Sequence, residues 1–192
     1  DFLPREHFLG RILQAARGAD EARGQLIRKI EAANVDLLPG DLRPALPSGK
    51  PAVWTVQPDA TISTTKAFCL VEAKRLRPSS FQPQQLARLA TTIADLSKSQ
   101  SAFCLLVLRE NPPVKVKAHG ELTLAEAVQL GDGKAGAPDP LRVDEQFAVI
   151  TWEEIASIVA DQVRPFANTD ASIELSIARL AAQVVQSVTR HH

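Results

Sequence analysis

The sequence holds few of the residues that mark secreted, membrane or zinc-binding proteins. It has two cysteines among 192 residues. Cys69 and Cys104 both lie inside apolar runs, where cysteine behaves as a small buried hydrophobe, so we expect neither a disulfide framework nor a zinc site. No apolar run approaches the roughly 20 residues that a membrane-spanning helix needs, and no signal peptide is recognised. We therefore expect a cytoplasmic protein with no membrane partner.

An excess of charge of one sign is also missing. The chain has 22 Lys and Arg against 22 Asp and Glu, a formal net charge of zero. No global basic field therefore attracts a polyanion, and any nucleic-acid binding must come from local patches. A glycine-rich phosphate loop is absent, which argues against a nucleotide-driven motor. The length fits a single domain, residues 1–192, with room for a core of its own.

The main feature that is present is an apolar segment that ends in charge. Residues 67–71 are apolar at every position, which is typical of a strand covered on both faces. Glu72, Ala73 and Lys74 follow directly. Because side chains alternate along a strand, Glu72 and Lys74 project from the same face. A carboxylate and an ammonium group are therefore expected side by side.

A second carboxylate is expected nearby. Residues 52–56 form a short β-prone segment that leads toward Asp59, and residues 60–64 form another. If the second of these pairs with the apolar strand, Asp59 lies beside Glu72. Two carboxylates suit Mg²⁺, which prefers one or two carboxylates together with waters and phosphate oxygens. Such an ion promotes phosphodiester hydrolysis by stabilising phosphoryl charge and activating water.

The pair Pro58-Asp59 with the triplet Glu72-Ala73-Lys74 resembles the motif of the PD-(D/E)XK nuclease superfamily, whose members have the restriction-endonuclease-like fold. The resemblance rests on these five residues and on the order of expected elements over residues 1–120. It implies an α/β domain with a central mixed β-sheet flanked by helices. It also implies a Mg²⁺-dependent endo- or exonuclease, with Mn²⁺ as a substitute. DNA is the implied partner, with RNA left open, and the products would carry 5′-phosphate and 3′-hydroxyl ends.

The resemblance assigns roles to four residues. Asp59, Glu72 and the main-chain carbonyl of Ala73 would hold the metal, and Lys74 would position or activate water. The plain structural alternative is a turn aspartate after proline and a surface ion pair at the end of a strand. A second Pro-Asp pair, Pro138-Asp139, follows the triplet in the chain, which is the wrong order for the motif.

Other members of the family add a glutamate from the first helical region and a glutamine from the helix after the lysine. Glu6 is the first candidate for the glutamate, with Glu21 and Glu31 as further candidates, although a solvated helix-face glutamate is the commoner reading of each. For the glutamine, which would be catalytic, the candidates are Gln85, Gln84 and Gln82, with Gln85 preferred.

Nucleic-acid contacts are expected beside the metal. Arg75 and Arg77 follow Lys74, and guanidinium groups bind phosphates bidentately. Gln84 lies close to them in sequence and is a further candidate contact. A solvated strand end is the competing interpretation of both arginines.

The remaining elements follow from periodicity and from breakers. Helices are expected over residues 4–17, 20–33, 83–96, 122–130, 152–163 and 170–188, and further strands over residues 102–108, 114–118 and 147–151. Residues from about 1 to 120 would form the core and those from about 121 to 190 a C-terminal helical extension. The last helix is apolar on more than one side, so it either packs deeply or is shared with a partner, as in a homodimer or a larger multidomain or multisubunit assembly.

Two other classes of function remain open at the level of sequence. The chain could be a catalytically inactive nucleic-acid-binding or assembly module on the same fold, with the chemistry supplied by another domain. It could also be a purely structural α/β domain. Metal binding separates the first of these from a nuclease, and DNA affinity at low salt separates the second.

Overall fold

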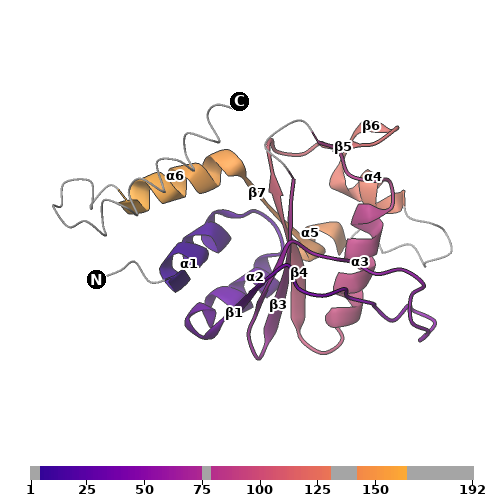
Figure 1. Cartoon of the computed structure of the whole chain (residues 1–192), viewed down its shortest axis with the longest axis horizontal. Helices are drawn as coiled ribbons and strands as arrows, with labels where there is room; N and C mark the ends of the chain where they lie inside the picture. Colours follow the sequence, from indigo (N-terminus) through magenta and orange to yellow (C-terminus); the bar gives the residue numbers. More distant parts are fainter. Residues whose placement is uncertain (1–4, 75–78, 131–141, 164–192) are drawn as a thin grey trace.

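The computed structural model describes residues 5–74, 79–130 and 142–163. These residues form an α/β domain built on a five-stranded mixed sheet flanked by helices, as expected (Figure 1). The strand order is β1-β2-β3-β4-β7. The strands are β1 (Asn34–Leu37), β2 (Ala60–Ser63), β3 (Ala67–Ala73), β4 (Ser101–Leu108) and β7 (Phe147–Thr151). A separate two-stranded sheet pairs β5 (Val114–Val116) with β6 (Gly120–Leu122).

Strand direction changes within the main sheet. Strands β1, β2 and β3 are antiparallel neighbours, whereas β3, β4 and β7 run parallel. The carboxyl ends of the three parallel strands therefore lie at one edge of the sheet, where ligands commonly bind in open α/β sheets.

Helices cover both faces of this sheet. They are α1 (Arg5–Ala15), α2 (Asp20–Ile27), α3 (Gln85–Leu96), α4 (Leu124–Gln129), α5 (Val143–Gln146) and α6 (Trp152–Val163), with a short 3₁₀ turn η1 (Ile30–Ala32) after α2. Figure 1 shows α1, α2 and α6 on one side and α3, α4 and α5 on the other. The core is correspondingly divided into two layers of buried side chains, one on each face.

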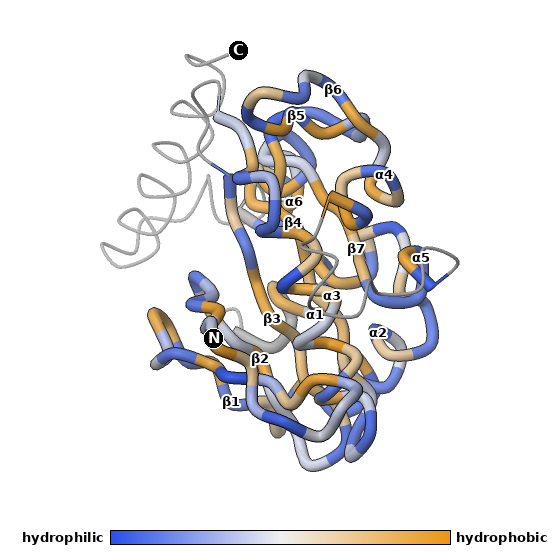
Figure 2. The backbone as a smooth tube through the Cα atoms, turned by 90° about the vertical axis from the view of Figure 1, so that its right-hand side faces the viewer, coloured by the Kyte–Doolittle hydropathy of each residue, from blue (hydrophilic) through white to orange (hydrophobic). Residues whose placement is uncertain are grey.

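Coverage on both faces explains the continuous apolar runs at residues 67–71 of β3 and 102–108 of β4. Leu70, Cys104 and Leu106 point into the layer under α3, whereas Cys69 and Leu105 point into the layer under α1 and α2. Both cysteines are buried and free, as expected. Figure 2 shows the hydrophobic colour continuing along much of these two strands.

Gly18 allows the chain after α1 to pass close to β7. It has a φ of +90°, and a Cβ at this position would lie 2.3 Å from the carbonyl oxygen of Phe147. The preceding residue, Arg17, exchanges two backbone hydrogen bonds with Val149, of 2.9 Å and 2.8 Å. The α1–α2 connection is thus held against the strand whose carboxyl end leads into α6.

Several sequence predictions differ from the structure. Residues 52–56 form no strand, and Val56 makes only an isolated bridge with Leu42. The strand that pairs with β2 on its outer side is β1, which the sequence did not predict. The predicted helix over 20–33 is interrupted after Ile27, and Asp20 is its first residue and not a side-chain cap.

The C-terminal part contributes to the sheet. Strand β7 pairs with β4, so residues 147–151, which we grouped with the C-terminal extension, belong to the central layer. The expected loop around Pro138-Asp139 and the expected helix over 170–188 lie outside the described residues. Within the described part of the chain, no helix has the length and apolar character needed to cross a membrane.

Candidate functional site

Glu72 and Lys74 lie at the carboxyl end of β3 and face α3. Leu70, two residues earlier, belongs to the core layer under α3, and the two-residue period places Glu72 and Lys74 on that same face. Lys74 Nζ donates a 3.0 Å hydrogen bond to Glu72 Oε1 and another of 3.0 Å to Gln85 Oε1. Gln85 Nε2 in turn donates a 2.7 Å bond to Glu72 Oε1. Glu72, Lys74 and Gln85 form a closed triangle of hydrogen bonds, which we call the Glu-Lys-Gln triangle.

Burial dominates the electrostatics of this triangle. Glu72 is only 8% exposed, and its burial raises the pKa of the carboxyl above its ordinary value, because water no longer solvates the charge. The ammonium of Lys74 and the amide of Gln85 oppose this rise in the pKa, while the negative charge of Asp59 adds to it. Burial and its two hydrogen-bond donors therefore act on the pKa of Glu72 in opposite directions.

Lys74 is also held by contacts from three parts of the fold outside the triangle. Its ammonium lies 4.3 Å from the centre of the Phe81 ring, a favourable cation–π arrangement. Its backbone N–H donates to the carbonyl of Val107 in β4 at 2.8 Å. Its own carbonyl accepts a 2.7 Å bond from the indole N–H of Trp152, at the start of α6. Backbone and side chain are thus both fixed.

Asp59 lies beside Glu72, directly before β2. Ala60 pairs with Val71, so Asp59 is one step beyond the register, opposite Glu72. Its backbone N–H donates to the carbonyl of Val71 at 3.0 Å, and its Oδ2 accepts a 2.7 Å bond from the N–H of Ala73. Asp59 is exposed and does not contact Lys74 by a hydrogen bond within the described residues.

The donor set fits a hard divalent cation through two carboxylates. Among the described residues, Glu72 Oε2 and Asp59 Oδ1 accept no hydrogen bond, so one oxygen of each carboxylate remains for a ligand. The same part of the chain contains no group of three His, Cys, Asp or Glu residues arranged to hold a metal. Mg²⁺ requires no more than one or two carboxylates, with waters and phosphate oxygens completing its octahedron.

Comparisons with protein-family models, curated proteins and solved structures found no match to this chain. The chemistry of the site is therefore inferred from its own residues and their geometry.

The other predicted site residues have different positions. Of the three candidate glutamines, Gln85 is the one whose side chain reaches the lysine. Gln84 is the N-cap of α3 and makes no side-chain capping bond. Gln82 offers only its backbone N–H, at 3.4 Å from Gln85 Oε1. The predicted phosphate contacts Arg75 and Arg77 lie outside the described residues.

The structure does not bring the alternative glutamates to this site. Glu21 lines a hollow together with Ser101 and Ala102, at the amino end of β4. Glu31 is exposed on η1, just before Asn34, which pairs with Ser63 at the end of β2 remote from Asp59. Glu6 lies in α1, and its side chain is outside the described part.

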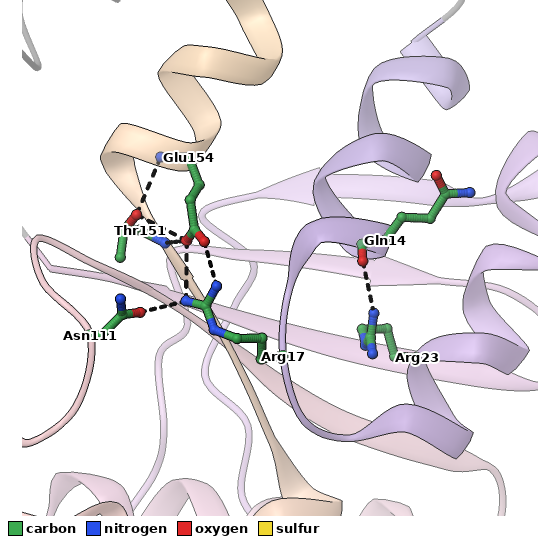
Figure 3. Close-up of polar contacts among 6 residues, drawn as sticks. All are labelled: Gln14, Arg17, Arg23, Asn111, Thr151 and Glu154. Carbon is green, nitrogen blue, oxygen red and sulfur yellow. Dashed lines mark hydrogen bonds and ion pairs between the residues drawn. The ribbon is translucent and has the colours of Figure 1, made fainter.

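Sequence reasoning missed the contribution of α6. Figure 3 shows the first turn of this helix with Glu154, which accepts hydrogen bonds from the backbone N–H and hydroxyl of Thr151 at 2.8 Å and 2.9 Å. Arg17 forms an ion pair with Glu154 and a hydrogen bond with Asn111. These contacts anchor the start of α6, and with it Trp152. No local sequence signal links Trp152 to Lys74, because 78 positions separate them.

Two adjoining hollows lie at the same edge of the sheet. The first has a volume of about 280 Å³ and is lined by Lys74, Phe81 and Arg109 and by the β5–β6 hairpin. The second, of about 590 Å³ and more open, extends from Arg109 and Glu110 to Thr151 and Glu154. Their shared residues, Arg109 and Glu110, follow the end of β4. The Glu-Lys-Gln triangle thus borders a concave surface large enough for a ligand.

Proposed function

We propose that this chain is a Mg²⁺-dependent nuclease of the PD-(D/E)XK type that hydrolyses phosphodiester bonds in DNA. The observation that carries the proposal is the Glu-Lys-Gln triangle at the end of β3, with Asp59 opposite Glu72, directly before the neighbouring strand β2. The residues of the motif therefore lie together, at the edge where ligands enter a parallel sheet. The order of elements, with helices before β1–β3, then α3 and the parallel strand β4, supports a restriction-endonuclease-like fold.

Each residue has a role in the proposed reaction. Asp59, Glu72 and the carbonyl of Ala73 would hold the metal. A bound Mg²⁺ ion would supply charge stabilisation at the phosphate and a more acidic water. Lys74 positions the attacking water and offsets the negative charge that develops on the phosphoryl oxygens. Gln85 holds the carboxylate and the ammonium in the geometry that both tasks require.

A binding-only module is the second candidate, and one observation favours it. Lys74 and Gln85 both bond to the same oxygen of Glu72, and the described residues offer only two carboxylates for a metal. In such a module the Glu-Lys-Gln triangle would stabilise the fold and would take no part in catalysis. Cation binding distinguishes the two, because a binding-only module would show no dependence on Mg²⁺ or Mn²⁺.

The proposal is tested with a panel of substrates and a metal titration. Supercoiled plasmid, single-stranded DNA and RNA are each incubated with the protein in Mg²⁺, in Mn²⁺ and in chelator. We expect metal-dependent cleavage of DNA, with 5′-phosphate ends on the products. Absence of cleavage on every substrate with either metal would overturn the proposal.

The metal site is tested by Asp59→Ala. We expect this variant to lose calorimetric binding of Mn²⁺ together with cleavage. Asp20→Ala is the matched control, because Asp20 is exposed on α2 and lines the hollow at the amino end of β4. Equal Mn²⁺ binding by the Asp59→Ala variant and the unmodified protein would exclude Asp59 as a ligand.

A further inference from the structure

The β5–β6 hairpin forms one wall of the cavity beside Lys74, and backbone hydrogen bonds hold it in place. The β5–β6 hairpin is attached to the segment before α3, because the backbone N–H of Phe81 donates to Lys115 at 2.8 Å and Phe81 accepts from Lys117 at 2.9 Å. Strand β5 alternates buried Val114 and Val116 with exposed Lys115. The hairpin therefore presents Lys115 to the cavity from a rigid backbone.

Cations from three elements line this cavity. They are Lys74 after β3, Arg109 after β4 and Lys115 on β5. The cavity also contains two carboxylates, Glu110 and Glu121. Glu121 lies opposite Lys115 in the hairpin register, and the side chain of Glu110 is largely exposed. Lys74 is already paired with Glu72, and Arg109 is the more enclosed member of its pair with Glu110.

Arg109 has unused hydrogen-bonding capacity. Among the described residues, its buried Nε–H finds no hydrogen-bond partner, although Glu110 Oε1 lies 3.3 Å away. A guanidinium group offers five donors in a planar fork, which matches two phosphate oxygens better than a single carboxylate oxygen. A buried donor whose one neighbour forms an ion pair but no hydrogen bond keeps the capacity to bond a ligand.

We infer that this cavity binds one backbone phosphate of the nucleic-acid strand, next to the phosphate that is cleaved, and that Arg109 is its main ligand. The inference rests on the proposed nuclease function. A volume of about 280 Å³ leaves room for a phosphate group of one backbone. The second hollow shares Arg109 and Glu110 with the first, so the strand can continue toward Thr151. Contact with a phosphate carries no sequence information, so this site positions the strand without selecting bases.

The test measures binding of two fluorescein-labelled DNA duplexes of unrelated sequence in chelator, where no turnover occurs. We expect Arg109→Gln to raise the Kd about tenfold for both duplexes alike. The loss of one phosphate contact should also reduce the slope of log K against log salt by about 0.9. In Mg²⁺, we expect Arg109→Gln to lower kcat/KM for cleavage by raising KM, with kcat unchanged. Arg142→Gln is the matched control, since Arg142 lines the hollow at the opposite end of the sheet, and we expect its Kd to match that of the unmodified protein.

The outcomes separate this inference from the proposed function. If the unmodified protein neither binds nor cleaves nucleic acid, the nuclease proposal fails and this site fails with it. If the unmodified protein binds and cleaves but Arg109→Gln leaves the Kd and the salt slope unchanged, only this site is refuted. A change in Kd for one duplex alone would also refute it, because it would indicate base readout. Should Arg109→Gln not fold, Arg109→Lys and Lys115→Gln provide the same test, with smaller increases in Kd for both duplexes.

Discussion

At the residue scale, the site depends on a shared acceptor. Glu72 Oε1 receives hydrogen bonds from Lys74 and from Gln85, and those two side chains also bond to each other. Burial raises the pKa of Glu72, and these two donors oppose that rise because they stabilise the charged carboxylate. A lysine in such a position is not interchangeable with arginine, because the donors of arginine are fixed in one plane whereas the three N–H groups of an ammonium rotate about its axis.

The role of Gln85 can be tested directly. Gln85→Ala removes one donor from Glu72 and one acceptor from Lys74. A hydrogen bond to a charged group contributes roughly 1.5–3 kcal/mol, so we expect the rate of cleavage to fall by about 10- to 100-fold. Gln84→Ala is the control, because the Gln84 side chain makes no capping bond, and it should cleave at the unmodified rate. Equal cleavage rates for Gln85→Ala and Gln84→Ala would show that Gln85 has no role in the reaction.

At the element scale, the start of α6 supports Lys74 from behind. The indole N–H of Trp152 bonds to the carbonyl of Lys74, and the Thr151–Glu154 contacts hold the first turn of the helix (Figure 3). In the proposed reaction we therefore expect Trp152 to act through Lys74, as a positioning residue. The strand and helix at residues 147–163 complete a site whose motif lies between residues 58 and 74.

Trp152→Phe keeps an aromatic ring but removes the N–H. A hydrogen bond contributes roughly 1 kcal/mol, so we expect kcat to fall about fivefold to tenfold while KM and the affinity for Mn²⁺ stay the same. Trp54→Phe is the control, because Trp54 lies beside Arg88 on a different part of the surface. If kcat is unchanged, or falls only as far as the folded fraction does, Trp152 has no positioning role.

The anchor of α6 predicts a dependence of stability on pH. Burial would raise the pKa of Glu154, but the hydrogen bonds and charge of Arg17 and the hydrogen bonds of Thr151 outweigh burial and lower the pKa below its ordinary value. A carboxyl group whose pKa is lower in the folded state than in the unfolded state stabilises the fold at pH values above its unfolded-state pKa. This stabilisation is lost as the pH falls through the folded-state pKa.

Glu154→Gln should therefore be less stable than the unmodified protein at pH 7, by about 1 kcal/mol or less for so exposed a pair. The difference should shrink as the pH falls below about 4.5, the ordinary carboxyl value. Urea unfolding at several pH values measures both quantities, with the exposed neighbour Glu153→Gln as control. A difference in stability that grows toward acid pH would contradict this assignment.

The elements also show what sequence patterns can and cannot predict. Strands β3 and β4 were predictable because continuous apolar runs require cover on both faces, and the two core layers supply it. Residues 52–56 look equally β-prone, yet Val53 is 97% exposed and the segment pairs with no strand. Strand β1 was missed because it is only four residues long and lies at the edge of the sheet, where Leu37, one of its two apolar side chains, is 75% exposed.

Some contacts of the candidate site could likewise be predicted from the sequence and others could not. Contact between Glu72 and Lys74 follows from the two-residue period. Gln85 was a candidate only through the resemblance to the nuclease superfamily, which also allowed Gln82 and Gln84. The contact with Trp152 and the cavity at Arg109 could not be predicted. They depend on β7 lying beside β4 and on the hairpin lying over Phe81, and neither long-range arrangement leaves a local signal.

At the scale of the whole molecule, the candidate site lies at one edge of the sheet, and the buried side chains beneath it stabilise the fold. Leu106 is fully buried in β4, in the layer that supports Glu72 and Gln85. Leu106→Ala should lower the free energy of unfolding by about 2–5 kcal/mol, because the removed methyl groups leave a cavity in the core. Leu37→Ala, at a side chain that is 75% exposed, should change it by less than about 0.5 kcal/mol. Similar losses for both variants in urea unfolding would refute this two-layer core.

The nuclease assignment itself depends on Lys74. Its most direct test is single-turnover cleavage of plasmid DNA in Mg²⁺ by the unmodified protein, by Lys74→Ala and by the control Lys98→Ala, whose side chain is exposed on the far side of α3 from the triangle. Removing one preorganised charge from a catalytic site costs about 10²–10³-fold in rate. We predict a loss of that size for Lys74→Ala alone, with folding and Mn²⁺ binding retained. Cleavage by Lys74→Ala at the rate of the unmodified protein would contradict the assignment.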